Sequence, residues 1–155
     1  MTDSSADRVR PVGINHVALE VGDVDDALEF YGDLFEFELR GRGDTSAFID
    51  MGDQFIALSE HATPNADEHR HFGLVVDDTE PLERRLEEFD VDVLDTRGLE
   101  FRDPWGNRVQ VVDYEEIQFT KAESVREGMG IDHLEKTEGA LEELAEKGIA
   151  PEDSE

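Results

Sequence analysis

The chain contains an internal repeat of 55 residues, and this repeat limits its possible folds more than any other feature. The segment HVALEV (16–21) aligns with HFGLVV (71–76) at an offset of 55 residues. The segment GDQFI (52–56) aligns with GNRVQ (106–110) at an offset of 54. In any chain that contains both helices and strands, some of these elements align with one another by chance. Two independent anchors that agree within one residue favour duplication of one supersecondary unit.

The first copy of the unit, residues 12–61, has the pattern of a strand, a helix and three further strands. Apolar and polar residues alternate over 14–21, which is typical of a half-buried strand. A helix is expected over 26–35, with Asp23 and Asp25 as candidate N-caps, because apolar residues recur there at helical spacing. The remaining strands are expected over 37–41, 46–51 and 54–59.

The second copy, residues 71–116, follows a polar linker at 62–70 and repeats the same order. Asp103, Pro104 and Gly106 supply the residue types that a type I turn favours at its first, second and fourth positions. This turn connects the last two strands of the unit. The expected elements are a strand at 72–76, a helix at 80–89, and strands at 91–95, 98–102 and 108–114.

The segments outside the repeat show different patterns. Residues 1–11 are polar and are expected to form a disordered arm. Residues 117–155 are expected to form a helical extension, with a short helix over 122–127 and a longer one over 133–147 that Gly148 ends. The narrow apolar stripe of the longer helix fits packing on its own domain, and also fits a dimer or lid contact.

The chain is strongly acidic, with 41 Asp and Glu against 14 Lys and Arg and a formal net charge of −27. The acidic residues are spread over segments with clear apolar periodicity, which indicates a folded protein from a salt-rich cytoplasm rather than an acidic tail. No basic stripe is available to neutralise phosphates. We therefore expect neither nucleic acid nor a membrane as a partner.

The sequence also limits the redox chemistry and the location of the protein. It contains no cysteine, which excludes disulfides, thiolate metal ligands and cysteine nucleophiles. No apolar run is long enough to span a membrane, and the N-terminal residues lack the apolar segment of a secretory signal. These features predict a cytoplasmic protein.

The repeat and its motifs resemble the vicinal oxygen chelate superfamily, which includes glyoxalases, bleomycin-resistance proteins and extradiol dioxygenases. The resemblance covers about 14–114 and depends on four segments. These are HVALEV (16–21), ALEFYGDLFEFEL (27–39), FGLVVDD (72–78) and FRDPWGNRVQ (101–110). It implies an α+β fold of two βαβββ modules, paired as half-barrels around a cleft, with the C-terminal helical extension added.

The resemblance also implies where a metal site would lie. Metal-binding members take ligands from the start of the first strand and from the last strand of each module. These positions carry His16 and His71 on the first strands, and Ile56 and Gln110 on the last strands. The implied ligands are His16, His71 and Gln110, with Ile56 and Gln110 at positions where metal enzymes commonly carry glutamate. Two imidazoles and one amide would form a neutral site.

Two kinds of function fit this resemblance. One is an enzyme that uses a divalent zinc, nickel, manganese or iron ion in the cleft for a lyase, isomerase or dioxygenase-like reaction. The other is a metal-free protein that binds a small molecule or drug. The resemblance further implies a homodimer. The expected substrate contacts in the cleft are Ala18, Ile56, Leu58, Arg108 and Val112.

Overall fold

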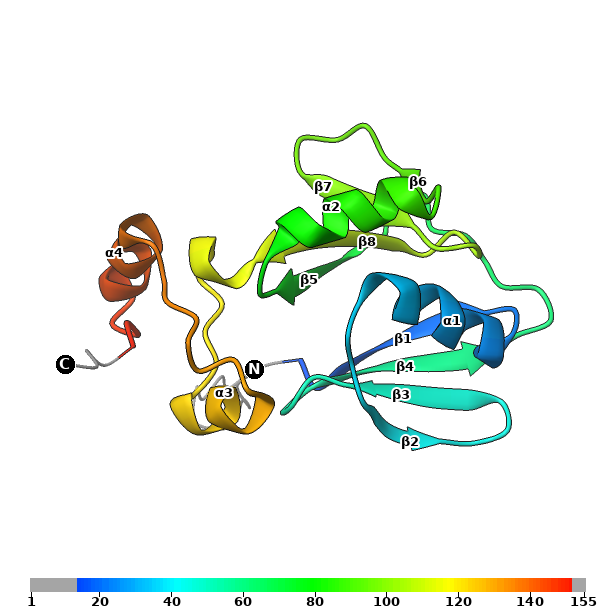
Figure 1. Ribbon diagram of the computed structural model, residues 1–155, viewed down its shortest axis with the longest axis horizontal. Coiled ribbons are helices and arrows are strands. Elements are labelled where there is room, and N and C mark those ends of the chain that lie inside the picture. The colour runs from blue at the N-terminus through cyan, green and yellow to red at the C-terminus, as the bar shows by residue number, and fades with distance from the viewer. Residues whose placement is uncertain (1–13, 152–155) are drawn as a thin grey trace, which may run out of the picture.

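The computed structural model describes residues 14–151. The expected arm at 1–11 therefore lies outside the described residues. Each half of the repeat forms a four-stranded mixed sheet with one helix on one face (Figure 1). The strand orders β1-β4-β3-β2 and β5-β8-β7-β6 are equivalent, as the internal repeat predicts. The fold is thus two βαβββ modules followed by C-terminal helices.

The first module is built from β1 (His16–Val21), α1 (Val24–Leu34), β2 (Leu39–Arg42), β3 (Ser46–Asp50) and β4 (Phe55–Glu60). The helix begins at Asp23, whose side chain accepts a hydrogen bond from the Asp26 amide. Asp23 is therefore the N-cap, and Asp25 lies inside the first turn. Strand β1 pairs with β4 in parallel, and His16 is in register with Phe55.

The second module is built from β5 (Phe72–Val76), α2 (Thr79–Glu88), β6 (Asp92–Val93), β7 (Leu99–Arg102) and β8 (Arg108–Asp113). The amide of Gly106 donates to the carbonyl of Asp103, which closes the expected turn between β7 and β8. Gly106 has a φ of +87°, a left-handed value that glycine adopts without strain.

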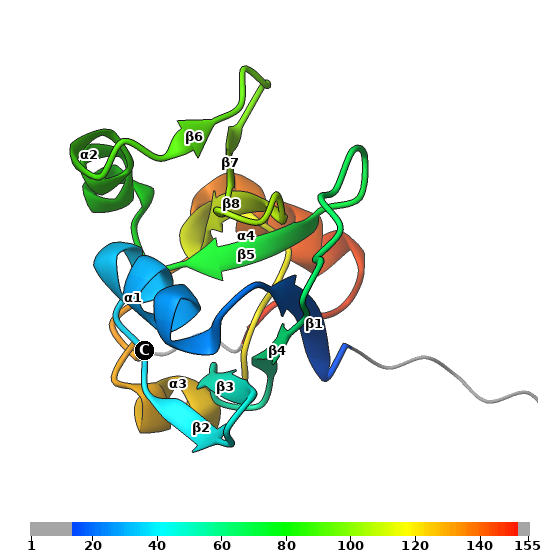
Figure 2. The same ribbon diagram turned by 90° about the vertical axis from the view of Figure 1, so that its right-hand side faces the viewer.

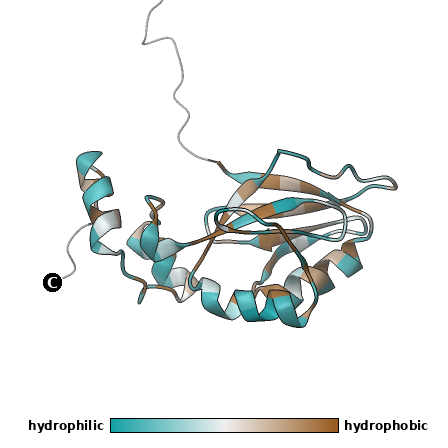
Figure 3. Cartoon of the chain, turned by 90° about the horizontal axis from the view of Figure 1, so that it is seen from above, coloured by the Kyte–Doolittle hydropathy of each residue, from teal (hydrophilic) through white to brown (hydrophobic). Residues whose placement is uncertain are grey.

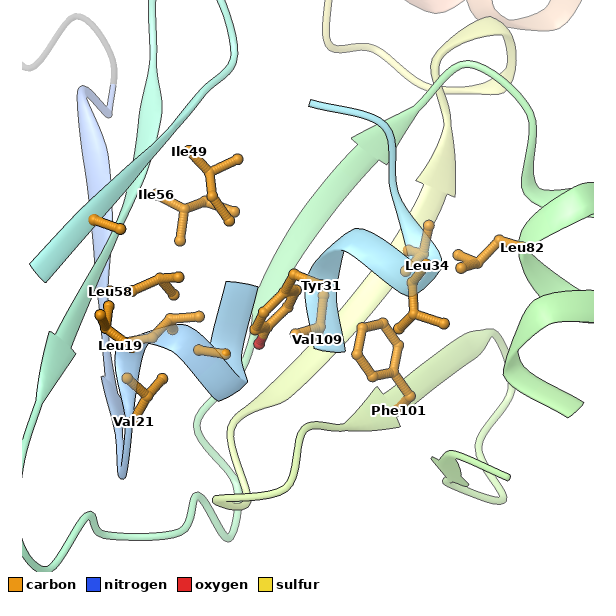
Figure 4. Close-up of a cluster of buried hydrophobic side chains, with 14 of the residues drawn as sticks. Leu19, Val21, Tyr31, Leu34, Ile49, Ile56, Leu58, Leu82, Phe101 and Val109 are labelled. Atoms are coloured by element: carbon orange, nitrogen blue, oxygen red, sulfur yellow. The ribbon is translucent and has the colours of Figure 1, made fainter. Parts of the chain in front are cut away.

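One hydrophobic core joins the two modules. Leu19, Leu58, Tyr31, Leu82 and Phe101 lie in a single buried cluster that contains residues of both sheets and both helices (Figure 4). Figure 2 shows α1 and α2 on the same side of the two sheets, so each sheet turns its other face away from the helices. We call these uncovered surfaces the open faces. Figure 3 shows both hydrophobic and hydrophilic residues along the strands, as expected when only one face is packed against helices.

The C-terminal extension contains a 3-10 turn (Tyr114–Glu116), α3 (Glu123–Met129) and α4 (Glu138–Glu146). The expectation of a helix from residue 133 is wrong, because Thr137 caps α4 by accepting a hydrogen bond from the Ala140 amide. Lys136 lies just before this cap. Its ammonium group donates to the backbone carbonyls of Tyr114, Ile117 and Phe119, which anchors the extension to the end of β8.

Within residues 14–151, none of the helices has both the length and the apolar character needed to cross a bilayer.

Candidate functional site

His16 lies at the start of β1 on the open face of the first sheet. Its exposed ring stacks on Phe55, with ring centroids 4.8 Å apart and planes 9° apart. The Nδ1 of His16 lies 2.9 Å from the Oδ1 of Asn15. An amide oxygen only accepts hydrogen bonds, so this contact favours the tautomer with the proton on Nδ1, in which Nε2 is the metal-binding nitrogen.

His71 lies immediately before β5, the equivalent position of the second module, and is also exposed. Its Nδ1 lies 3.0 Å from the backbone carbonyl oxygen of His69. This contact favours the same tautomer, with the proton on Nδ1 and Nε2 as the metal-binding nitrogen. Metal-ligating histidines are commonly oriented through their second nitrogen in this way.

Gln110 lies on the open face of the second sheet. It is in register with Gly73 on the parallel neighbour β5, and His71 shares that face because it is two residues before Gly73. Arg108 and Val112 alternate with buried residues of β8, so they lie on the same face as Gln110. The open face of one sheet therefore carries His71 and Gln110 together.

Ile56 and Leu58 do not lie on an open face. They are 3% and 0% exposed and pack against α1 with Leu19 and Val21 (Figure 4). The expectation that they contact a substrate in the cleft is corrected by this packing, since β4 presents them to the core. Ala18, in contrast, is exposed on the same strand face as His16.

The counterpart of Gln110 in the first module is Ala57 rather than Ile56. Ala57 is in register with Ala18, two residues after His16, just as Gln110 is in register with Gly73. Ala57 is five residues after the turn glycine Gly52, whereas Gln110 is four residues after the turn glycine Gly106. Aligning the two sequences on these glycines therefore pairs Gln110 with Ile56 instead of Ala57. Neither alanine nor isoleucine can bind a metal, so the first module contributes only His16.

Arg108 is already paired within the second sheet. Its Nε and Nη2 donate to the Oε2 of Glu100 at 2.7 and 2.6 Å, and Glu100 is only 5% exposed. An anionic substrate group would have to compete with this carboxylate for Arg108. Glu100 was not expected from the sequence as a site residue, although its place between apolar Leu99 and Phe101 on a strand predicts that it faces away from the core.

A cavity of about 360 Å³ lies between β1 and the start of β5. His71, Glu20 and Asn107 line it, and the Asn107 Nδ2 donates to the carbonyl of Glu20 at 2.8 Å. The other lining residues are Val17, Ala18, Leu19, Asn65, Ala66, Asp67, Arg70 and Phe72. His16 does not line this cavity.

His16 and His71 both lie at the start of their strands, but β1 and β5 run in opposite directions (Figure 1), so the two histidines do not lie side by side within one chain. The start of β5 pairs with the start of β8 and lies near the end of β1 that carries Glu20, because Asn107, just before β8, donates to the Glu20 carbonyl. His16 is about 13 Å away from Glu20 along β1, since a strand rises about 3.3 Å per residue. A single chain therefore does not bring both rings to one cavity. Among the described residues, no group of three His, Asp or Glu side chains is placed to hold a metal ion.

The fold agrees with a comparison against protein families. Residues 13–111 match the model of the Glyoxalase/Bleomycin resistance protein/Dioxygenase superfamily, which covers both modules up to the middle of β8. The chain belongs to this superfamily. The matched segment ends before the 3-10 turn, α3 and α4, so the C-terminal extension lies outside the part that the superfamily model describes.

Among curated proteins, the chain is similar to two bacterial transferases of comparable length. It is 28% identical over 110 residues to the glutathione transferase FosA of Serratia marcescens, covering 63% of this chain and 78% of that protein. It is 30% identical over 97 residues to the metallothiol transferase FosB of Staphylococcus epidermidis, covering 59% of this chain and 70% of that protein.

Among solved structures, the chain is similar to the lactoylglutathione lyase of Agrobacterium tumefaciens. The TM-score is 0.54 at 26% identity, over 67% of this chain and 95% of that protein. This superfamily fold supports unrelated reactions, so function has to be argued from the site itself.

Proposed function

We propose that this superfamily member is a divalent-metal-dependent enzyme acting on a small molecule, with a site assembled from two copies of the chain. The observation that carries the proposal is the matched state of His16 and His71. Both rings are exposed, and the Nδ1 of each lies within hydrogen-bond distance of an oxygen acceptor, which favours the tautomer that leaves Nε2 as the metal-binding nitrogen. An imidazole retained only for packing needs no such orientation.

The arrangement of the open faces supports assembly from two copies. The helices cover one face of each sheet, and the other faces carry His16 on the first sheet and His71 with Gln110 on the second. A twofold partner could place the open face of its second sheet over the open face of the first sheet of this chain. His16 of one copy would then meet His71 and Gln110 of the other. The same operation would create an identical second site.

The proposed donor set suits a first-row divalent ion. Two neutral imidazoles are good ligands for zinc, nickel and iron, and the amide oxygen of Gln110 can complete the set. The set carries no charge of its own, which predicts a weaker site than one with a carboxylate. The net charge of −27 partly compensates for this weakness, because a strongly acidic surface raises the local concentration of cations.

The side chains argue against isomerisation, and the similarity to a glutathione transferase and a metallothiol transferase supports thiol transfer. Ala57 on β4 and Gln110 on β8 occupy the last-strand positions at which metal enzymes of this kind commonly carry glutamate. Neither strand therefore supplies a carboxylate there to remove a proton from carbon. Thiol transfer to a small epoxide needs no such base. A sulfur–carbon bond forms, a carbon–oxygen bond opens, the thiol proton goes to water and the oxygen takes up a proton. A bound divalent ion would stabilise the negative charge that develops on that oxygen.

Metal binding and thiol transfer can be tested together. Protein purified in molar KCl is loaded with zinc, nickel, manganese or iron(II), dialysed and analysed for bound metal. It is then assayed for consumption of glutathione with a panel of small epoxides. We expect near-stoichiometric metal that H16A and H71A lose, while H133A, in the loop before α4, retains it. Background metal in the parent protein under all four conditions would overturn the proposal.

A metal-free binding function has one specific observation in its favour. The ring of Phe55 contacts three neighbours on the open face of the first sheet: His16 stacks on it, Phe48 meets it edge-on at 5.7 Å, and the Arg40 guanidinium lies 4.8 Å from its centroid. Such a cluster could bind a planar ligand by stacking. Thermal stabilisation by planar drugs without any bound metal would support this second function.

A further inference from the structure

Three consecutive backbone carbonyls before β5 are each held by a side chain. The carbonyl of Asp67 accepts a hydrogen bond from the Nη1 of Arg102, and the carbonyl of Glu68 accepts one from the Nη1 of Arg108. The carbonyl of His69 accepts from the Nδ1 of His71. Residues 67–69 belong to the linker between the modules. The three acceptor carbonyls are consecutive, and the last of them contacts His71, the candidate ligand.

The two arginines are themselves fixed by the second sheet. Arg102 and Arg108 are opposite each other in register on β7 and β8. The Nη1 of Arg102 also donates to the carbonyl of Gly106 at 3.0 Å. The buried carboxylate of Glu100 accepts from the Nε and Nη2 of Arg108. Because the guanidinium is planar, these two contacts set its orientation, and the remaining nitrogen, Nη1, points at the linker.

Further contacts hold the same linker segment against the turn between β7 and β8. The amide of Asp67 donates to the carbonyl of Gly106 at 3.0 Å, and the amide of Arg108 lies 3.2 Å from the Oδ2 of Asp67. Ala66 packs so close to Gly106 that a Cβ on Gly106 would lie 2.4 Å from the Cβ of Ala66. The linker therefore has a defined path at the point where it enters β5.

We infer that Arg108, aligned by Glu100 and assisted by Arg102, is a positioning residue for His71. By holding the carbonyl of Glu68, Arg108 fixes the orientation of the adjoining peptide, and the carbonyl of His69 then selects the Nδ1–H tautomer of His71. This role explains why the carboxylate of Glu100 is buried beside Gln110 and paired with the half-buried Arg108, although desolvation of the carboxylate is costly. The inference rests on the proposed role of His71 as a ligand.

The role predicts an effect on the ring of His71 that a general loss of stability does not produce. Loss of the contact to Glu68 lets the His69 carbonyl turn away, so the Nε2–H tautomer becomes populated and the lone pair on Nε2 is lost for part of the time. Outer-shell partners of metal ligands typically change metal affinity by about 10-fold to 100-fold when removed.

The test uses the full chain in molar KCl and compares R108M with R84M. Arg84 forms an exposed ion pair with Glu80 on α2, so R84M removes an equal charge and one ion pair from the exposed surface of this helix. Nitrogen-15 NMR of the imidazole rings, assigned with H71N, reports the tautomer of His71 at one fixed pH. Calorimetric titration with zinc chloride reports the affinity. We expect R108M to populate the second tautomer and to lose about 10-fold or more in affinity, with R84M unchanged.

R108K provides a second variant if R108M fails to fold. A lysine can pair with Glu100 but has no fork to reach the carbonyl of Glu68 at the same time, so it should also mix the two tautomers. An unchanged tautomer of His71 in folded R108M or R108K would overturn the inference, whatever the metal affinity. If the parent protein binds no zinc while the tautomer still changes, the proposed function fails and the positioning role stands.

Discussion

The hydroxyl of Tyr31 donates a hydrogen bond of 2.8 Å to the Oδ2 of Asp103, joining α1 of the first module to the turn before β8 of the second. Asp103 also accepts hydrogen bonds from the amides of Trp105 and Asn107 and from the Asn107 side chain. Burial first, and then the nearby charge of Asp103, raise the pKa of Tyr31 well above its ordinary value. A single buried network thus connects the two halves of the repeat.

Y31F is expected to lower the free energy of unfolding by about 1–3 kcal/mol, because it leaves the buried carboxylate of Asp103 without one of its donors. Urea unfolding in a fixed concentration of KCl measures this loss. F35L, which changes a half-buried ring beside Tyr31 but removes no hydrogen bond, serves as the control. Equal stability of Y31F and the parent would contradict the role of this contact.

The turn glycine of the second module should not tolerate a side chain. Gly106 has a φ of +87° and lies against Ala66, so G106A adds both backbone strain and a steric clash. We expect a loss of at least about 1 kcal/mol in the free energy of unfolding. G139A on α4 is the matched control, because a Cβ there meets no atom within 4 Å and alanine favours a helix. G106A should lower the melting temperature, and G139A should maintain or raise it.

Lys136 predicts a specific dependence of stability on pH. Burial, followed by repulsion from Arg126, lowers the pKa of Lys136 from 10.5 to about 8. Between these two values the unfolded chain binds more protons at this residue than the folded chain does, so this residue makes the free energy of unfolding rise with pH. The stability of the parent relative to K136Q, measured by urea unfolding, should increase from pH 8 to pH 10. A constant or falling difference would show that the pKa is not lowered.

The acidic surface predicts that salt stabilises the fold. In molar KCl the Debye length falls to about 3 Å, so repulsion among the acidic side chains is screened. We expect the melting temperature to rise steadily from 0.1 M KCl, where the Debye length is about 10 Å. Replacing the exposed Glu142, Glu143 and Glu146 by glutamine should weaken this rise. A flat series would argue against adaptation of this surface to high salt.

The sequence predicted the order of the elements because apolar periodicity and turn chemistry are local properties. It indicated Asp23 and Asp25 as candidate caps of α1, of which Asp23 is the N-cap, and it placed the turn at Asp103, because capping and turn residues are specific. It did not predict that Ile56 faces the core, because strand register depends on one extra residue after Gly52 that no local pattern reveals. The start of α4 was also misplaced, since Lys136 is held by carbonyls of a distant segment rather than by a helix.

The candidate site was predictable in its residue types and only partly in its geometry. His16 and His71 are found at matched positions, because duplicated strands repeat their register along with their sequence. The relative direction of β1 and β5 depends on how the two modules pack. Because the two strands run in opposite directions, the histidines at their starts are separated within one chain. Glu100 and its partner Arg108 were not connected in advance, because their pairing requires the register of β7 and β8.

Mixing two inactive variants tests the two-copy site most directly. H16A and H71A are each expected to bind metal only at background level. After co-refolding in molar KCl, a heterodimer would contain one intact site, built from His16 of one copy and His71 of the other, and one site lacking both. A statistical mixture should therefore recover about a quarter of the parent metal content. A mixture that stays at background, while the parent binds one ion per chain, would contradict the two-copy site.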